Sequence, residues 1–168
     1  MDPLTIRAGG RADVPQVLAL LDGAVEWLVA AGRSGQWGTE PHSSNPRRIE
    51  QITDFADSGG LWIAERAGRV VGALAVGDAM PYVPAATEPE VYVRLLITDR
   101  ASAGQRIGTE LLDHARKLAR KLGVGLLRVD CYAGGDGALI RYYERQGFTR
   151  DQTFVVGEWH GQILVEHL

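Results

Sequence analysis

The segment from Ala103 to Thr109 has the composition of an anion-binding loop. It follows a β-favouring run, VYVRLLIT at residues 91–98, and precedes an amphipathic helical pattern. The first backbone N–H groups of a helix have no acceptor inside the helix, and the helix dipole adds partial positive charge there. The loop also supplies two glycines for close backbone approach, Gly104 and Gly108, and the cation Arg106. This combination predicts a phosphate site, with the Thr109 hydroxyl as a further donor.

An ordinary glycine-containing loop is the alternative interpretation, because loops before helices often contain glycine. The segment lacks the Gly-Lys-Ser/Thr ending of a nucleotide P-loop. It also lacks the G-x-G-x-x-G spacing of a dinucleotide site. The residues alone therefore leave both interpretations open, a phosphate site and an ordinary loop.

The remaining reactive side chains indicate neither a metal site nor a nucleophilic triad. Cys131 is the only cysteine, which excludes an intramolecular disulfide, and its β-favouring surroundings predict a small core residue. The four histidines are scattered without metal-ligand spacing, and no Ser, His and Asp arrangement indicates a triad.

Hydrophobic periodicity predicts the elements that position the loop. After a first strand at residues 4–9, Asp13 is expected to cap a helix whose apolar face repeats every three or four residues. Pro46 starts a second helix, and Ala67-Gly68 forms the turn of a hairpin. The other expected elements are a strand at 91–98, a helix at 107–122, a strand at 126–132, a helix at 137–147 and a final hairpin joined through His160-Gly161.

The predicted order is β α α β β β α β α β β. Consecutive strands argue for antiparallel pairing, and the strand–helix–strand unit in the second half argues for one parallel pair. We therefore expect an α/β (α+β) fold with a mixed, mostly antiparallel central sheet of about seven strands and helices on both faces. A single domain is expected from Leu4 to Leu168.

Length and composition exclude several classes of protein. The chain has 168 residues, a net charge of −3, 45% hydrophobic and 23% charged residues, which is typical of a globular domain. The mild acidity argues against a nucleic-acid partner. The longest apolar stretch, at residues 70–76, is too short to cross a membrane, and no signal sequence is evident. A cytoplasmic protein without a membrane partner is expected.

Two motifs resemble the acetyl-CoA-binding core of the GNAT N-acetyltransferase superfamily. They are AGQRIGTELL at residues 103–112 and YERQGF at residues 143–148. The element order is also similar to that family from Leu4 to Leu168, although specific motifs support the resemblance only between about residues 91 and 148. In the family's loop pattern, Arg/Gln-x-x-Gly-x-Gly/Ala, the first position is Ala103 here and the central glycine is Arg106. Asp136 stands where an Asn is frequent, and Tyr92 and Arg94 stand where a strand glutamate is frequent.

The resemblance implies acetyl-CoA as the acetyl donor, without a metal. The loop would bind its pyrophosphate, and the preceding strand would line the pantetheine arm and offer N–H groups to the thioester carbonyl. The implied cofactor residues are Leu96, Ile97, Thr98, Ala103, Gly104, Gln105, Arg106, Ile107, Gly108, Thr109 and Tyr143.

The resemblance also implies a general acid. Tyr143 stands where the family's tyrosine protonates the leaving thiolate, and a core tyrosine is the alternative. The general base is less defined. Glu90 and Glu88 are candidates that could act through a water, and His160 is another. The alternatives are that each is a solvated or turn residue, or that a weak amine needs no dedicated base.

The acceptor site of the family uses the segment after the first helix, the loop before the fourth strand and the C-terminal hairpin. Here these regions hold Trp37, Tyr82, Glu88 and Trp159. Aromatic walls and a carboxylate would suit a cationic amine. The alternative is that Trp37 and Trp159 cover the edge of the core. Trp27 and Trp62 fall on expected core faces.

These residues predict an N-acetyltransferase that transfers acetyl from acetyl-CoA to an amine, with a small-molecule acceptor as the expected partner. A non-catalytic acyl-CoA-binding protein on the same fold is the main alternative, and a phosphate-binding module unrelated to CoA is another. A homodimer is left open.

Overall fold

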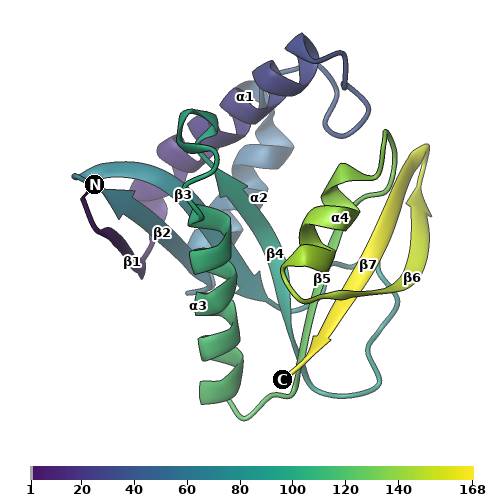
Figure 1. Cartoon of the computed structure of the whole chain (residues 1–168). Coiled ribbons are helices and arrows are strands. Elements are labelled where there is room, and N and C mark those ends of the chain that lie inside the picture. The colour runs from purple at the N-terminus through teal and green to yellow at the C-terminus, as the bar shows by residue number, and fades with distance from the viewer. Residues whose placement is uncertain (1) are drawn as a thin grey trace. The chain divides into compact units, whose positions relative to one another are not determined.

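The computed structural model describes residues 2–168, and its elements follow the predicted order (Figure 1). The strands are β1 (Leu4–Ala8), β2 (Leu61–Arg66), β3 (Arg69–Gly77), β4 (Glu90–Thr98), β5 (Leu126–Tyr132), β6 (Thr149–Val156) and β7 (Trp159–His167). The helices are α1 (Val14–Ala30), α2 (Pro46–Asp57), α3 (Ile107–Lys121) and α4 (Ala138–Arg145). Short 3-10 turns occur at Arg11–Asp13, His42–Ser44 and Arg100–Ser102. None of the helices in residues 2–168 has the length and apolar character needed to cross a membrane.

The strands form one open seven-stranded sheet in the order β1-β2-β3-β4-β5-β7-β6. The pair β4–β5 is parallel, whereas β1–β2, β2–β3, β5–β7 and β6–β7 are antiparallel. The predicted mixed α/β sheet with a parallel pair in the second half is therefore confirmed. The parallel pairing ends at Val93 and Val129, although β4 continues to Thr98 and β5 to Tyr132.

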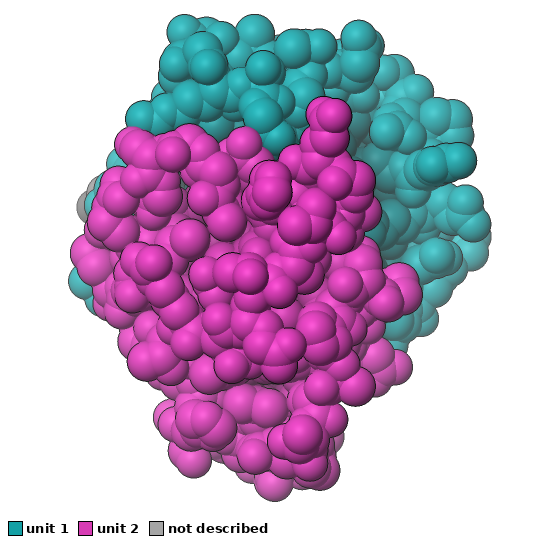
Figure 2. Space-filling view, turned by 90° about the vertical axis from the view of Figure 1, so that its right-hand side faces the viewer, with its two compact units in different colours: residues 1–76, 95–113 teal, residues 77–94, 114–168 magenta. Residues whose placement is uncertain are grey.

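The chain divides into two compact units, which Figure 2 shows in different colours. Unit 1 contains residues 1–76 and 95–113, and unit 2 contains residues 77–94 and 114–168. The division runs through β4 and through α3, so both elements contribute to both units. The single domain from Leu4 to Leu168 stays a prediction.

In unit 1, helices pack against both faces of the strands. The apolar face of α1 is buried as its periodicity predicted, and it packs with α2 against β3 residues that include Ala73 and Ala75. Side chains alternate between the two faces of a strand, so position 72, just before Ala73, faces the other side of β3, towards α3. A Cβ at Gly72 would lie 2.9 Å from Ile107 Cγ2, so glycine allows this close approach. Helices on both faces are thus explained by the period of two in β3.

Unit 2 is built around β5 and the β6–β7 hairpin. Leu127, Ile163 and Leu164 are fully buried. Arg116 on α3 donates to Glu166 at 2.6 Å and to the carbonyl oxygen of Gln146 at 2.6 Å, and so ties together three segments that are distant in sequence. Cys131 is buried, as expected for a core residue.

Three local predictions differ from the structure. The final hairpin turns at Gly157 and not at His160-Gly161, which lie within β7, because Val156 pairs with Trp159 and Gly157 takes a positive φ of 61° between them. The Asp13 carboxylate does not cap α1; it accepts a hydrogen bond from Gly10 N–H at 2.9 Å and pairs with Arg7 at 2.7 Å, because a 3-10 turn precedes the helix. Trp27 is 43% exposed rather than part of the core, and the Arg100 guanidinium lies 3.8 Å above its ring. Trp27 lies outside the buried face of α1. The prediction put it on that face because the indole was counted as an apolar residue.

Candidate functional site

The predicted phosphate loop connects β4 to α3 within unit 1. The chain turns through Arg100–Ser102 and then passes through Gly104 and Arg106, with φ of +82° and +61° respectively. The helix starts at Ile107, and Glu110 N–H donates to Arg106 O at 3.1 Å as its first turn closes. The N–H groups that come before Glu110 in this turn have no acceptor within the helix. The loop therefore has the backbone form of an anion site.

The loop is held at both ends by the β2–β3 hairpin. Arg69 donates to Asp99 Oδ2 at 2.7 Å, and Asp99 N–H donates to the Val71 carbonyl at 2.8 Å. Further along, Arg66 donates to Gln105 Oε1. The Gln105 side chain therefore fixes the position of the loop relative to β2. The Gln105 N–H donates to Ser102 O at 3.3 Å.

Arg106 stands where the family that this loop resembles usually has glycine. Its backbone lies in the left-handed region, which glycine enters at no steric cost and other residues enter at about 1–2 kcal/mol. The side chain is exposed, and within residues 2–168 its guanidinium has neither a hydrogen-bond nor an ion-pair partner. The strained backbone of Arg106, its unpaired guanidinium and the neighbouring helical N–H groups without acceptors together suit the binding of a phosphate.

The predicted β4 residues divide between the two faces of the strand. Ile97 belongs to the buried core of unit 1 together with Leu95, so only its backbone could meet a ligand. Leu96 and Thr98 alternate with it and are partly exposed. The structure therefore leaves Leu96 and Thr98 as the side chains able to line a pantetheine arm.

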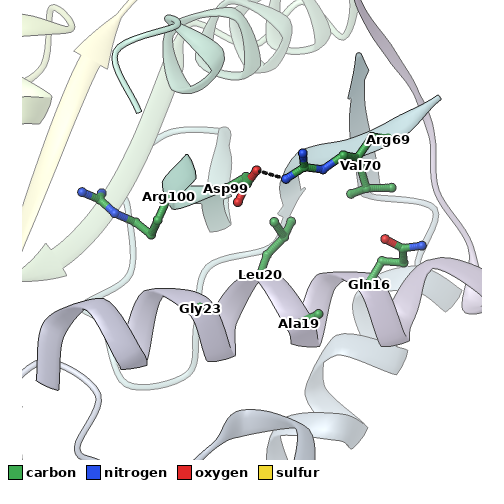
Figure 3. A pocket seen from close by; sticks show the side chains of 8 residues that line it. All are labelled: Gln16, Ala19, Leu20, Gly23, Arg69, Val70, Asp99 and Arg100. Atoms are coloured by element: carbon green, nitrogen blue, oxygen red, sulfur yellow. Dashed lines mark hydrogen bonds and ion pairs between the residues drawn. The ribbon is translucent and has the colours of Figure 1, made fainter. Parts of the chain in front are cut away.

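A pocket of about 200 Å³ lies beside the start of the loop, against α1 (Figure 3). Figure 3 shows Arg69 and Asp99 joined above the helix and the Arg100 side chain directed away from them. None of the predicted cofactor residues lines it, so it is separate from the phosphate loop. Its lining consists of Gln16, Ala19, Leu20, Gly23, Arg69, Val70, Asp99 and Arg100.

Tyr143, the predicted acid, lies on α4 in unit 2. Only 6% of it is exposed, and its ring meets Tyr142 and Phe148 edge to face at centroid distances of 5.2 and 5.7 Å. Burial raises the pKa of the Tyr143 phenol well above its ordinary value, and the nearby Cys131 adds to the effect. The hydroxyl therefore remains protonated at neutral pH, which is the state that a general acid must start from.

Glu90, the first candidate base, is bound by a cation. Arg128 donates to both of its carboxylate oxygens, and the side chains of Glu90 and Arg128 are only 14% and 4% exposed. Arg128 also donates to Pro84 O at 3.0 Å. A base role for Glu90 would require this ion pair to open. The other two candidates, Glu88 and His160, are exposed.

Two of the predicted acceptor residues fall in one row of aromatic rings in unit 2. Tyr82 stacks on Phe154 at 5.5 Å, Phe154 lies 5.9 Å from Trp159, and Trp159 lies 5.7 Å from Tyr132. Gly161 leaves room for this row, because a Cβ there would lie 2.2 Å from Phe154 Cζ. We call Tyr82, Phe154, Trp159 and Tyr132 the aromatic row.

The other two predicted acceptor residues lie elsewhere. Trp37 packs against the core of unit 1 and meets His42 edge to face at 5.5 Å, which accounts for it without a ligand. Glu88 lies in the loop before β4, is exposed, and is not part of the aromatic row.

A partly buried polar pair that was not predicted from the sequence joins β4 and β5. The Tyr92 hydroxyl donates to Asp130 Oδ2 at 2.6 Å. The two residues are 38 positions apart and become neighbours only through the parallel pairing of their strands. The signal available in the sequence was the presence of polar residues within two β-favouring runs, at residues 91–98 and 126–132. Elsewhere in the described chain, no group of three or more His, Cys, Asp and Glu residues could hold a metal ion.

Solved structures with the same fold are numerous. A ribosomal-protein-alanine N-acetyltransferase from Brucella melitensis is 24% identical with a TM-score of 0.68, and the match covers 98% of this chain and 99% of that one. A GNAT-family acetyltransferase from Listeria monocytogenes is 21% identical with a TM-score of 0.71, covering 98% and 95%. YncA from Salmonella typhimurium, solved with its cofactor acetyl-CoA, is 21% identical with a TM-score of 0.69, covering 99% and 94%. At these identities the likeness shows the fold alone.

The family itself is shown by sequence. No curated protein sequence matches the chain. The model of the acetyltransferase (GNAT) family, in contrast, matches residues 21–148, which include the phosphate loop, Tyr92, Asp130 and Tyr143. This range covers well over half of the chain, and the chain therefore belongs to the GNAT acetyltransferase family.

Proposed function

We propose that this protein is an N-acetyltransferase that moves the acetyl group of acetyl-CoA to the amine of a small molecule. The observation that carries the proposal is the loop before α3. It combines unpaired helical N–H groups with a left-handed Arg106 whose cation is uncommitted, and it lies in the segment that matches the family. The family's use of acetyl-CoA identifies the phosphate-bearing ligand that this loop would hold.

When bound, acetyl-CoA supplies a thioester carbonyl that an amine can attack and a thiol that can leave. The backbone donors from Gly104 to Thr109 would hold the pyrophosphate, with Arg106 adding a charge-assisted contact. Leu96 and Thr98 would line the pantetheine arm. Tyr143 holds a proton on its phenol oxygen and would give it up as general acid.

The aromatic row supports an amine acceptor with a flat or cationic body. Ring faces attract ammonium groups and stack on planar groups, and Tyr82 is the most exposed member at 42%. A small molecule fits this row better than a folded protein surface, because the row is short: its rings come from the β6–β7 hairpin, from β5 and from Tyr82 in the loop before β4.

The proposal is tested by thiol release from acetyl-CoA with a panel of primary amines, together with calorimetric binding of CoA. Saturable thiol release that depends on the amine supports it. CoA binding without release for any amine would instead favour a non-catalytic acyl-CoA-binding protein. A thermal shift with inorganic pyrophosphate but none with CoA would favour a phosphate-binding module of another kind.

Tyr143→Phe tests the acid. Removing the phenol proton donor should lower kcat by about 10²-fold or more, while CoA affinity changes little. Tyr142→Phe is the matched control, because Tyr142 is the adjacent residue on α4 and its ring packs against Tyr143. Full turnover by Tyr143→Phe at every pH would remove Tyr143 from the mechanism.

A further inference from the structure

Asp130 is a partly buried carboxylate that the fold leaves short of partners. Its one hydrogen bond within residues 2–168 comes from the Tyr92 hydroxyl, at 2.6 Å. The cation whose charge acts on Asp130 is Arg128, two residues away on β5, and it is committed to both oxygens of Glu90. An ionised carboxylate can accept several hydrogen bonds, so Asp130 keeps acceptor capacity for a ligand.

The surroundings of Asp130 favour its protonated form more than water does. Burial raises the pKa of its carboxyl above the ordinary value, although the Tyr92 hydrogen bond and the charge of Arg128 act in the opposite direction. The other titratable groups that interact with it are the Cys131 thiol and the Tyr143 phenol, which are neutral at pH 7. No full counter-charge is therefore bound to this carboxylate within unit 2.

Asp130 is also linked to the aromatic row. Its partner Tyr92 interacts electrostatically with Tyr82, which is one end of the row. At the other end, Tyr132 is two positions after Asp130 on β5, so the two side chains leave the same face of the strand from Cα atoms about 7 Å apart. From Tyr132 the row continues through Trp159 and Phe154 to Tyr82. A carboxylate next to aromatic rings can bind an amine that carries an aromatic ring: the carboxylate pairs with the ammonium group, and the protein's rings stack on the ring of the amine.

We propose that Asp130 binds the ammonium group of the acceptor and takes its proton, with Tyr92 as the positioning residue. This inference rests on the proposed acetyltransferase function. The acceptor class is an arylalkylamine, whose ring stacks on the aromatic row while its ammonium faces Asp130. In the proton step, the N–H bond of R–NH3+ breaks and its electron pair stays on nitrogen. The proton bonds to a carboxylate oxygen of Asp130, which gives neutral R–NH2 and a carboxylic acid that later returns the proton to water.

Asp130→Asn tests the proton acceptor. Asparagine keeps the size and an oxygen that can accept from Tyr92 but cannot take a proton. We expect kcat/KM for phenethylamine to fall by about 10²-fold at pH 7. We also expect the loss to shrink as the pH approaches that amine's own pKa, where the acceptor no longer needs a base. Asp151→Asn is the control, because it removes an exposed carboxylate on β6 and should leave the rate unchanged.

Tyr92→Phe tests the positioning role. The hydrogen bond from Tyr92 lowers the pKa of Asp130, so its removal should raise that pKa further. The rising limb of kcat/KM against pH should then move to higher pH, while the plateau above it is kept. A purely structural tyrosine would lower the rate equally at every pH.

Protein stability separates these effects from misfolding. A carboxyl whose pKa is raised by folding stabilises the native state below its unfolded pKa, and this contribution is lost as the pH rises through the folded pKa. At pH 8 the ionised Asp130 gives no such contribution, so Asp130→Asn should unfold at the same temperature as the wild type or higher.

Each outcome has one meaning. If the wild type turns over and Asp130→Asn shows the same rate and the same pH profile, the role of Asp130 is overturned and the acetyltransferase proposal stays intact. Absence of wild-type turnover with any amine would overturn the proposed function and the proton step together. The ammonium contact would then be decided by calorimetry, since phenethylamine should bind wild type at least tenfold tighter than Asp130→Asn, and equal affinity would refute the contact.

Discussion

Replacing Arg106 by glycine should stabilise the protein and weaken its hold on CoA. Arg106 occupies the left-handed region at φ +61°, which costs a non-glycine residue about 1–2 kcal/mol. Glycine avoids this cost but loses about 0.5–1 kcal/mol more chain entropy on folding. The net gain is about 0.5–1 kcal/mol, which corresponds to a rise in Tm of about 1–4 °C for a chain of this length.

The effect on CoA has the opposite sign. The Arg106 guanidinium is exposed and has no partner among residues 2–168, so its loss removes a solvent-screened contact to phosphate while the backbone donors remain. An exposed charge pair contributes up to about 1 kcal/mol, so Kd should rise by up to about fivefold. The salt dependence of binding should also become weaker, since one fewer cation faces the phosphates.

Thermal unfolding and calorimetric titration with CoA, each at two salt concentrations, measure both effects. Arg106→Lys is the control, because lysine keeps the charge and the backbone strain and should match the wild type in Tm and Kd. A lower Tm for Arg106→Gly would refute the strain argument. Equal Kd values for all three proteins would refute contact between Arg106 and phosphate.

Three further predictions concern stability and reactivity. Glu90→Gln leaves the Arg128 charge buried without its counter-ion and should cost about 3 kcal/mol in urea unfolding, whereas a loss below about 1 kcal/mol would mean that the pair is dispensable. Ala67→Asn should raise Tm by about 1–4 °C, because both turn residues, Ala67 and Gly68, have positive φ and asparagine tolerates that region; an unchanged Tm would contradict this. Burial raises the pKa of the Cys131 thiol to about 12, so native protein should resist iodoacetamide at pH 8 and react only after denaturation; rapid modification of native protein would contradict this burial.

The sequence predicted what depends on local pattern. The helix at Val14–Ala30 and the hairpin around Ala67-Gly68 followed from periodicity and turn chemistry, and the structure confirms both. The parallel pair in the second half followed from the strand–helix–strand order.

Partners across strands were not predictable in the same way. Glu90 was interpreted as a free carboxylate because nothing near it in sequence pairs with it, and its partner Arg128 is 38 positions away. Asp130 was overlooked for the same reason, since the parallel register that brings it to Tyr92 joins positions 38 apart in the sequence. The row that contains Tyr82 and Trp159 needed Phe154 between them, which sequence alone could not supply.

The two arginines that hold the phosphate loop flank a single tight turn. Arg66 and Arg69 face each other across the end of the β2–β3 hairpin, and they reach Gln105 and Asp99 respectively. Hairpin tips usually tolerate insertions. Here one added residue in the turn would shift Arg66 and Arg69 relative to each other. The conformation of the loop more than thirty positions downstream would then change, because both arginines bind it. The length of this turn is therefore constrained by the shape of a loop that lies elsewhere in the sequence.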